Sequence, residues 1–508
     1  MDNLHVDNTT FQNYCKVSSA GEPYLATIKV IDDLTTPVAA LLKIGLDQNN
    51  IFLLESVKGG ETRGRYSVIG LNPDQCFRVL AGKPQISVNN SEFVDIDDSP
   101  VVALRNFVQQ SDVPVLPDLP PMLSGVFGYI GYDAVNWIEN IPLKIGSNLQ
   151  TPDAVLIRPT LMAVFDSVKQ EIILSRRIEP TPSKKQARVW QTVQLELQNL
   201  RDKILGQLKV SPVIQSQKPN NRLKPSSNTS KKQFQQMVRK AKSYIKDGDV
   251  FQVVLSQRFS VPFTNHPFAL YRSLRKSNPS PFLYYMQLPE FCIIGSSPEI
   301  LVRVRNNKIT IRPIAGTRPR GATLAEDEKN ELDLLADKKE LAEHLMLLDL
   351  GRNDAGRVAK SGTVKVTKSF AIERYSKVMH IVSNIEADLA TKSDALDALF
   401  AGFPHGTVSG APKIRAMEII SELEQESRGI YAGAIGYFSA NGDLDTCIAL
   451  RTAIIKNEVM HVQAGGGNVL DSDEEAERME TIHKAQALFD AAASAWRFDV
   501  TIKSSGEI

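Results

Sequence analysis

The spacing of hydrophobic residues changes several times along this chain of 508 residues. In the first part, short runs of β-branched and aromatic residues alternate with turn signals at 51–54, 66–70 and 161–165, which is typical of strands. From 186 to 208 apolar residues return at helical spacing and predict a helix. The first part is therefore predicted to be rich in sheet and to end with a helix.

The second part mixes helical and strand patterns without strict alternation. The predicted helices are 232–247, 333–350, 412–424 and 473–496. The predicted strands are 250–256, 291–295, 300–304, 308–312, 431–438, 445–455 and 459–464. Because regular βαβ units are absent from this pattern, we expect an α+β fold, built as a layered sandwich.

One segment separates the two parts by its composition. Residues 209–232 are rich in Pro, Ser, Asn and Lys and poor in bulky apolar residues, as exposed linkers are. We therefore expect a sheet-rich N-terminal half at 1–208, a linker at 209–232 and a second domain at 233–508. The length fits two domains or one unusually large one.

Composition excludes several classes of protein. The chain is 42% hydrophobic and 23% charged, with a net charge of +1, so it is a globular protein without the excess of basic residues that nucleic acids or anionic membranes attract. Neither a membrane-spanning apolar run nor a signal peptide is recognisable. Four distant cysteines without a CxxC pair argue against a disulfide framework. We expect a cytoplasmic protein.

Two predicted helices carry carboxylates at matching spacing. Glu340 and Glu343 are three residues apart, as are Glu477 and Glu480, and Lys484 follows one turn later. Residues at i, i+3 and i+4 share a helical face. These could be solvated faces, or together they could form a Mg²⁺ site. A di-iron centre is a third interpretation, because Glu480 begins one ExxH pattern, but such centres need a second ExxH in a helical bundle.

Other segments supply groups that bind anions. Glycines at 463–468 and 316–321 allow a backbone to approach a ligand closely, and 404–413 leads into a helix N-terminus. Arg451 ends an apolar strand, and His380 is flanked by apolar residues. Taken alone, Arg451 could equally well form a structural ion pair, and the apolar neighbours of His380 favour a core histidine over a catalytic one. Together these features predict a site for a small polyanion and leave its identity open.

The motifs around these groups resemble those of the chorismate-utilising enzymes, and most closely the anthranilate synthase component I family. The segments that carry the resemblance are 295–299, 313–318, 342–354, 407–413, 445–447 and 463–465, with 53–56, 64–67 and 125–129 upstream. The resemblance implies antiparallel-rich sheets flanked by helices. It also implies a lyase that converts chorismate and ammonia to anthranilate and pyruvate, the first committed step of tryptophan biosynthesis.

The resemblance assigns roles residue by residue. Direct Mg²⁺ ligands are expected at Glu343 and Glu480, with Glu340 and Glu477 acting through water. The residues expected to take part in catalysis are His380, Glu299, Thr317 and Lys484. The residues expected to contact chorismate are Gly316, Thr317, Tyr431, Arg451, Gly465, Gly466, Gly467 and Lys484.

Two positions separate this chain from its relatives by chemistry. Family members that add water carry a lysine base where Gln252 stands, and aminodeoxychorismate synthases carry a nucleophilic lysine where Ala315 stands. Both differences favour direct attack by ammonia. An aminodeoxychorismate synthase component I without that lysine remains the enzymatic alternative, and a non-catalytic tryptophan-sensing protein is the other. Asn468 stands where an apolar residue is usual, and the sequence gives no reason for it.

A feedback site and a partner are also implied. Glu55, Ser56, Pro281, Phe282 and Leu283 resemble the L-tryptophan pocket of the family, although Phe282 and Leu283 replace the usual Tyr-Met. Ammonia at neutral pH is mostly ammonium, and the sequence has no cysteine in a nucleophile-elbow context. We therefore expect a hetero-oligomer with a glutamine amidotransferase subunit that supplies ammonia.

Overall fold

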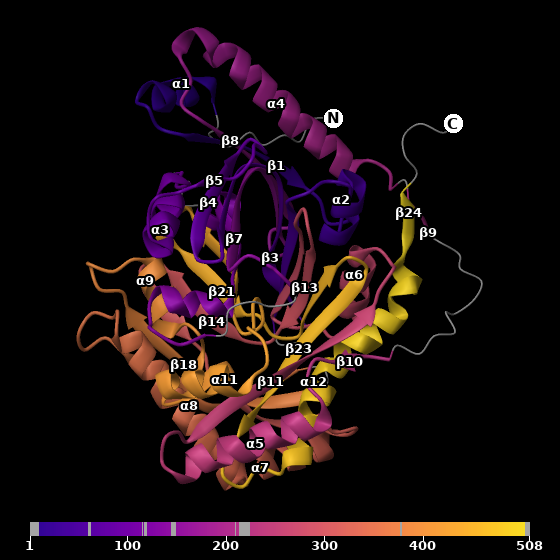
Figure 1. Cartoon of the computed structure of the whole chain (residues 1–508). Helices are drawn as coiled ribbons and strands as arrows, with labels where there is room; N and C mark the ends of the chain where they lie inside the picture. The colour runs from indigo at the N-terminus through magenta and orange to yellow at the C-terminus, as the bar shows by residue number, and fades with distance from the viewer. Residues whose placement is uncertain are drawn as a thin grey trace.

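Helices and antiparallel strands build the molecule in layers (Figure 1). The computed structural model describes residues 10–58, 62–113, 115, 119–143, 149–208, 210–212, 224–375 and 378–502. Within them the helices flank strands that pair antiparallel. The predicted α+β class is confirmed. Most of the predicted linker, residues 213–223, lies outside the described residues.

The sheet is organised around β7 (Ala154–Asp166), a strand that is buried along its whole length. It pairs with β3 (Thr62–Leu80) along one edge and with β6 (Gly125–Ile130) and β8 (Glu171–Ile178) along the other. One arm of the sheet continues through β3 (Thr62–Leu80), β2 (Ile51–Lys58), β12 (Phe282–Gln287), β13 (Cys292–Ser297), β22 (Thr452–Lys456), β23 (Val459–Asn468) and β11 (Gln252–Pro262).

A second arm starts from the other edge of β7. It continues through β6 (Gly125–Ile130), β20 (Ala434–Ser439), β21 (Leu444–Ile448), β14 (Ile300–Arg305), β15 (Lys308–Ile311) and β18 (Val378–Asp388), which also pairs with β16 (Ile314–Pro319) and β17 (Lys365–Arg374). In both arms strands of the first half are hydrogen-bonded to strands of the second. The predicted halves therefore share one sheet.

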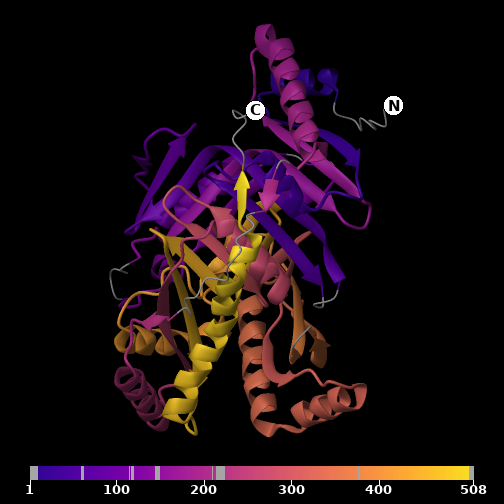
Figure 2. The same ribbon diagram turned by 90° about the vertical axis from the view of Figure 1, so that its right-hand side faces the viewer.

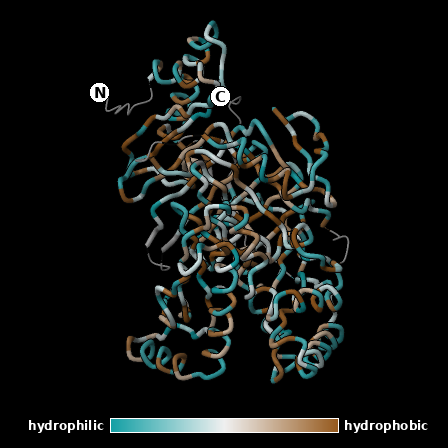
Figure 3. Tube along the Cα trace, turned by 90° about the vertical axis from the view of Figure 1, so that its left-hand side faces the viewer, coloured by the Kyte–Doolittle hydropathy of each residue, from teal (hydrophilic) through white to brown (hydrophobic). Residues whose placement is uncertain are grey.

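One long helix packs on the far end of each arm. α12 (Glu474–Ser494) packs on β23, and α8 (Lys338–Gly356) packs on β16 and β18. Figure 2 shows α12 in yellow and α8 in orange, running through the same end of the molecule. Both begin with an aspartate cap: Asp473 accepts from two backbone N–H groups of α12, and Asp337 does the same for α8. Figure 3 shows hydrophilic and hydrophobic residues next to one another along the outer helices.

Most predicted elements are found, with three differences. The expected helix 333–350 is two helices, α7 (Leu324–Ala336) and α8, because Asp337 has extended backbone angles and caps α8. The expected strand 445–455 is β21 and β22, separated at Arg451, whose φ of 48° is left-handed. The expected glycine turns at 316–321 and 463–468 lie mainly in β16 and β23, since both segments pair with neighbouring strands.

The other predicted helices are confirmed as α4 (Ser183–Leu205), α5 (Lys231–Lys246) and α11 (Lys413–Leu423). All four cysteines are free. Among the described residues, no helix combines the length and the apolar character that a membrane crossing requires.

Candidate active site

Carboxylates of α12 lie beside the glycine segment of β23, and Glu343 of α8 is connected to it through Gln252. Glu343 accepts a hydrogen bond of 3.0 Å from Gln252 Nε2, and Gln252 lies so close to Gly467 that a Cβ there would be 2.2 Å from the same nitrogen. A Cβ on the neighbouring Gly466 would lie 3.1 Å from Glu477 Oε2 and 3.5 Å from Glu480 Oε1. Because these glycines lack side chains, Gln252, Glu477 and Glu480 can lie close to the backbone of β23.

Like charges in this cluster repel one another. Burial, and then the charge of Glu343, raise the pKa of Glu340. Burial also raises the pKa of Glu477, and Glu480 adds to the rise although Ser472 donates to Glu477 Oε1 at 2.6 Å. Glu477 Oε2 is buried and has no hydrogen-bond partner among the described residues. Uncompensated carboxylates of this kind are suited to a cation.

Lys484 connects the carboxylates with the glycines. Its ammonium group lies 2.7 Å from Glu480 Oε1 and donates to the carbonyl oxygen of Gly465 at 3.0 Å. The same charge acts on Glu299, whose pKa it lowers. Lys484, which the sequence places one helical turn after Glu480, thus bridges the Glu480 carboxylate and the backbone of Gly465.

His380 is held on β18 opposite Thr317 of β16. Its Nδ1 lies 3.0 Å from the carbonyl oxygen of Gly316 and 3.1 Å from Thr317 Oγ1. A carbonyl can only accept, so Nδ1 carries the proton and Nε2 carries a lone pair. Burial, with a smaller contribution from the charge of Arg451, lowers the pKa of His380 to about 4. Its ring is therefore neutral near pH 7.

Gly316 itself has a left-handed φ of 71°, which favours glycine. A Cβ at this position would also lie 3.3 Å from Glu340 Oε2. β16 therefore connects the histidine with the carboxylates of α8.

Glu299 lies between β13 and β14 and is only 4% exposed. Burial raises the pKa of its carboxyl to about 8, in spite of the backbone N–H of Ile314 and the charge of Lys484. The Thr407 hydroxyl is 3.3 Å from Oε2, whereas Oε1 has no hydrogen-bond partner among the described residues. Glu299 is therefore mainly a neutral acid at pH 7.

Two further predicted residues adjoin this cluster. Burial raises the pKa of Tyr431 to about 12, and its hydroxyl bonds the backbone of Gly465. Burial lowers the pKa of Arg451. Within the described residues its guanidinium makes neither a hydrogen bond nor an ion pair, so this cation is available to an anionic ligand.

The residues predicted to bind an effector line one cavity of about 720 Å³. They lie on paired strands, where Ser56 of β2 faces Phe282 of β12 and Glu55 faces Leu283. All five predicted residues line this cavity: Glu55, Ser56, Pro281, Phe282 and Leu283. Arg275 donates to both oxygens of Glu55, at 2.6 and 2.9 Å.

The same cavity borders the residues around His380. Tyr375 is part of its lining, and the Tyr375 ring contacts the His380 ring edge to face, with centroids 5.5 Å apart. Pro298, next to Glu299, and Ile314 also line it. The effector cavity and the predicted catalytic residues are thus separated by single side chains.

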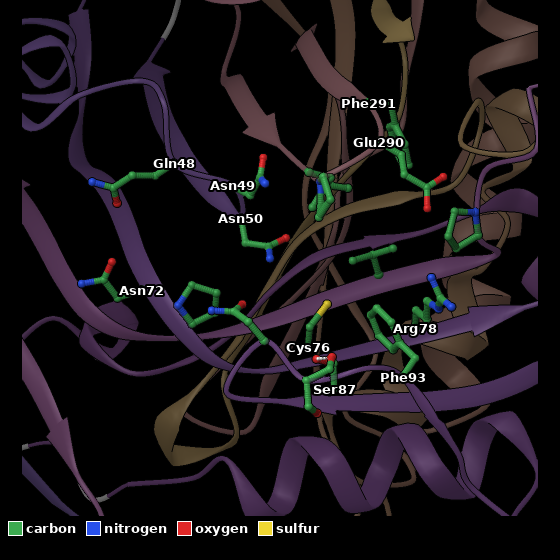
Figure 4. A pocket seen from close by; sticks show the side chains of 17 residues that line it. Gln48, Asn49, Asn50, Asn72, Cys76, Arg78, Ser87, Phe93, Glu290 and Phe291 are labelled. Atoms are coloured by element: carbon green, nitrogen blue, oxygen red, sulfur yellow. Dashed lines mark hydrogen bonds between the residues drawn. The ribbon is translucent and has the colours of Figure 1, made fainter. Parts of the chain in front are cut away.

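A second cavity, of about 520 Å³, lies elsewhere (Figure 4). Its lining includes Asn49, Asn50, Cys76 and Arg78, the last stacked on Phe93 at 3.7 Å from the ring centroid. None of the residues predicted for catalysis, substrate, metal or effector lines it.

Sequence reasoning missed three parts of the site. It used Gln252 only to separate reaction types and did not place it against Glu343, because that contact depends on the register between β11 and β23. It gave His405 and Thr407 no role, although both lie beside Glu299. It also gave no reason for Asn468. The Asn468 amide donates to the carbonyl oxygens of Val253 and Gly466 and so fixes the end of the glycine strand.

The fold and this arrangement define a class of enzymes that bind chorismate. The family model described as chorismate binding enzyme matches residues 50–490. The chain belongs to this family and, within it, to the group of anthranilate synthase component I proteins.

Its relatives cover nearly the whole chain. A protein named anthranilate synthase component 1 from Cereibacter sphaeroides is 48% identical over 501 residues, 96% of this chain and 98% of the relative. One of the same name from Acetivibrio thermocellus is 44% identical over 474 residues, 92% of this chain and 95% of the relative. The resemblance found in the sequence is confirmed.

Solved structures agree on the fold. The crystal structure of anthranilate synthase component I from Streptococcus pneumoniae matches with a TM-score of 0.71 and 37% identity, over 91% of this chain and 98% of the other. The menaquinone-specific isochorismate synthase from Escherichia coli matches with a TM-score of 0.69 over 96% of this chain and 99% of the other. At 20% identity the second match shows the fold alone.

Proposed function

We propose that this chain is the synthase component of an anthranilate synthase, a lyase that converts chorismate and ammonia to anthranilate and pyruvate. One observation carries the proposal. Several residues that the family resemblance assigns to this reaction adjoin the glycines of β23: Lys484 donates to Gly465, and Glu343 accepts from Gln252, which lies against Gly467. The charge of Lys484 also acts on Glu299. The extent of the relatives named anthranilate synthase component 1 supports the same conclusion.

Chorismate carries one carboxylate on its ring and another on its enolpyruvyl group. The guanidinium of Arg451 has no ion-pair partner in the described part of the chain, and it is suited to one of these carboxylates. The backbone of Gly465–Gly467 is suited to approach the other closely, since these glycines carry no side chain of their own. Tyr431 and Lys484 fix the orientation of this backbone.

The carboxylates fit Mg²⁺. Glu343 and Glu480 would hold the ion, and Glu340 and Glu477 would act through water. The unpartnered Glu477 Oε2, and the short distance of Glu477 and Glu480 from Gly466, suit this arrangement. Among the described residues no three His, Cys, Asp or Glu side chains are grouped closely enough to chelate a metal by themselves. The substrate carboxylate and water would complete the shell. When bound, the ion neutralises the ring carboxylate.

The acid and base roles follow from the protonation states. Ammonia adds at C2 as the C4 hydroxyl leaves, and pyruvate is then eliminated from the ring. Glu299 holds a proton near pH 7 and acts as the general acid that protonates a leaving oxygen. His380 offers a lone pair at Nε2, so it orients a hydroxyl or accepts a proton instead of donating one.

Two regulatory and supply functions complete the proposal. The relatives' name, component 1, implies a second component, and ammonium predominates at neutral pH. We therefore assign the supply of ammonia to a glutamine amidotransferase partner. We place both in the cytoplasm, where the free cysteines would stay reduced. We assign feedback inhibition by L-tryptophan to the 720 Å³ cavity. A ligand there would contact Tyr375 and through it affect His380.

The test is an assay of the purified chain with chorismate, Mg²⁺ and an ammonium salt at alkaline pH. We expect a product with anthranilate fluorescence, and no product when glutamine replaces ammonium. Fluorescence that develops only after a lyase is added would instead identify an aminodeoxychorismate synthase. Use of glutamine by this polypeptide alone would contradict the separate amidotransferase.

A further inference from the structure

Another buried histidine, His405, lies beside Glu299. His405 precedes the short helix α10 (Gly406–Ser409) and is 3% exposed. Its Nδ1 accepts from the backbone N–H of Thr407 at 3.3 Å, lies 2.8 Å from Thr407 Oγ1 and is 3.6 Å from Glu299 Oε1. None of the roles proposed above uses this imidazole.

The hydrogen bonds around Thr407 can be assigned one proton at a time. Because Nδ1 of His405 accepts from a backbone N–H, its ring proton is on Nε2 and Nδ1 carries a lone pair. The Thr407 hydroxyl, 2.8 Å from that lone pair, therefore donates to it. A hydroxyl has a single proton, so we assign Thr407 Oγ1 as the acceptor in its 3.3 Å contact with Glu299 Oε2; the opposite direction requires a hydroxyl that does not donate to His405. The matching donor is a protonated Glu299 carboxyl.

The charges around both groups agree with this assignment. Burial and the charge of Lys413 on α11 lower the pKa of His405 to about 3, so its ring stays neutral. Lys413 is itself paired with Asp354 of α8 at 2.9 Å. Lys484 of α12 favours ionised Glu299, but burial outweighs it. The neutral phenol of Tyr375, after β17, also lies in the field of Glu299.

We propose that His405 is a positioning residue for Glu299. Its neutral ring takes the hydroxyl proton of Thr407, so that Thr407 accepts a hydrogen bond from Glu299 and keeps that carboxyl in its acid form. This role rests on the proposed function, in which Glu299 is the general acid. His405 keeps that carboxyl protonated at the pH of the reaction. Without His405, the Thr407 hydroxyl is free to turn and donate to an ionised Glu299, which favours the carboxylate.

Two substitutions separate the acceptor atom from the bulk of the ring. His405→Ala removes the acceptor, whereas His405→Asn places a carboxamide oxygen near the position of Nδ1 and keeps a good helix cap. His461→Asn is the matched control, because His461 is a partly buried histidine of β23 that bonds Ser260 at 2.9 Å. Far- and near-ultraviolet circular dichroism verifies that each variant is folded.

The readout is the infrared carbonyl band of protonated Glu299, identified by its loss in Glu299→Gln and followed from pH 5 to pH 9. We expect His405→Ala to lower the titration midpoint by about one pH unit, a tenfold change in the ionisation constant. His405→Asn and His461→Asn should keep the wild-type midpoint. An unchanged midpoint in His405→Ala, or the same shift in His405→Asn, would overturn the proposal.

The spectra require no substrate, so they stand apart from the assay of function. If the wild-type chain forms no anthranilate while the midpoint still shifts, the proposed reaction fails and the pairing of His405 with Glu299 holds. If anthranilate forms, the alkaline limb of the pH–rate profile, where Glu299 loses its proton, should move with the infrared midpoint in His405→Ala. A limb that stays in place would contradict the positioning role.

Discussion

Replacing Glu299 by glutamine should stabilise the protein while it abolishes turnover. The carboxyl of Glu299 is buried, and its pKa is raised from the ordinary 4.5 to about 8. Between these two values the folded state binds more protons than the unfolded state, so the free energy of unfolding falls as pH rises. Glutamine has nearly the same shape and does not ionise, and therefore escapes this loss.

The size of the effect follows from the same values. One pKa unit corresponds to about 1.4 kcal/mol, so at pH 7 the 2.5 units above the ordinary value predict a gain of about 3 kcal/mol for Glu299→Gln. Below pH 4.5 the gain disappears, because the carboxyl is protonated in both states. Above pH 8 it reaches its full size of about 5 kcal/mol and no longer changes.

Urea unfolding of both proteins at pH 5, 7 and 8.5 measures this difference. The amide of glutamine can donate to Thr407 as the protonated carboxyl does, and contributions that do not depend on pH cancel between the three conditions. We expect the gain to grow with pH while anthranilate formation is lost. A difference in stability that is the same at pH 5 and pH 8.5 would refute the buried, protonated carboxyl.

Three further changes test separate parts of the site. In Gly467→Ala the new Cβ would meet the Gln252 amide at 2.2 Å and displace it from Glu343. We expect kcat to fall about ten- to a hundredfold while circular dichroism stays unchanged. A wild-type kcat would contradict the contact between Gln252 and Glu343. Glu343→Ala should fold normally and lose Mg²⁺-dependent turnover, so an unaltered response to added Mg²⁺ would reject this ligand. Arg275→Met leaves the buried Glu55 carboxylate without two hydrogen bonds. The variant should lose about 2 kcal/mol of stability in urea unfolding and be inhibited more weakly by tryptophan. An unchanged inhibition curve would remove Glu55 from the effector site.

Local rules predicted the parts of the site that depend on one helix. The i,i+3 spacing of Glu340 and Glu343 placed both on one face of a helix, and α8 carries them in this way. The same spacing did not reveal where α8 begins. Asp337 lies within a continuous helical pattern, and its action as a cap depends on the chain turning there to pack α8 on β16 and β18.

Contacts between distant strands could not be predicted from spacing. The glycines at 465–467 look like a turn in the sequence, but pairing of β23 with β11 extends them into a strand. That register brings Gly467 opposite Val254 and places the Gln252 side chain against Glu343. The position of His405 beside Glu299 likewise depends on tertiary packing, since 106 residues separate the two along the chain.

The most direct test of the proposed reaction is the fate of labelled nitrogen. The purified chain is incubated with chorismate, Mg²⁺ and ¹⁵N-ammonium, and the products are identified by mass spectrometry. The account predicts anthranilate that contains the heavy nitrogen, together with an equal amount of pyruvate. Isochorismate, an aminated product that retains its enolpyruvyl group, or unchanged chorismate would contradict it.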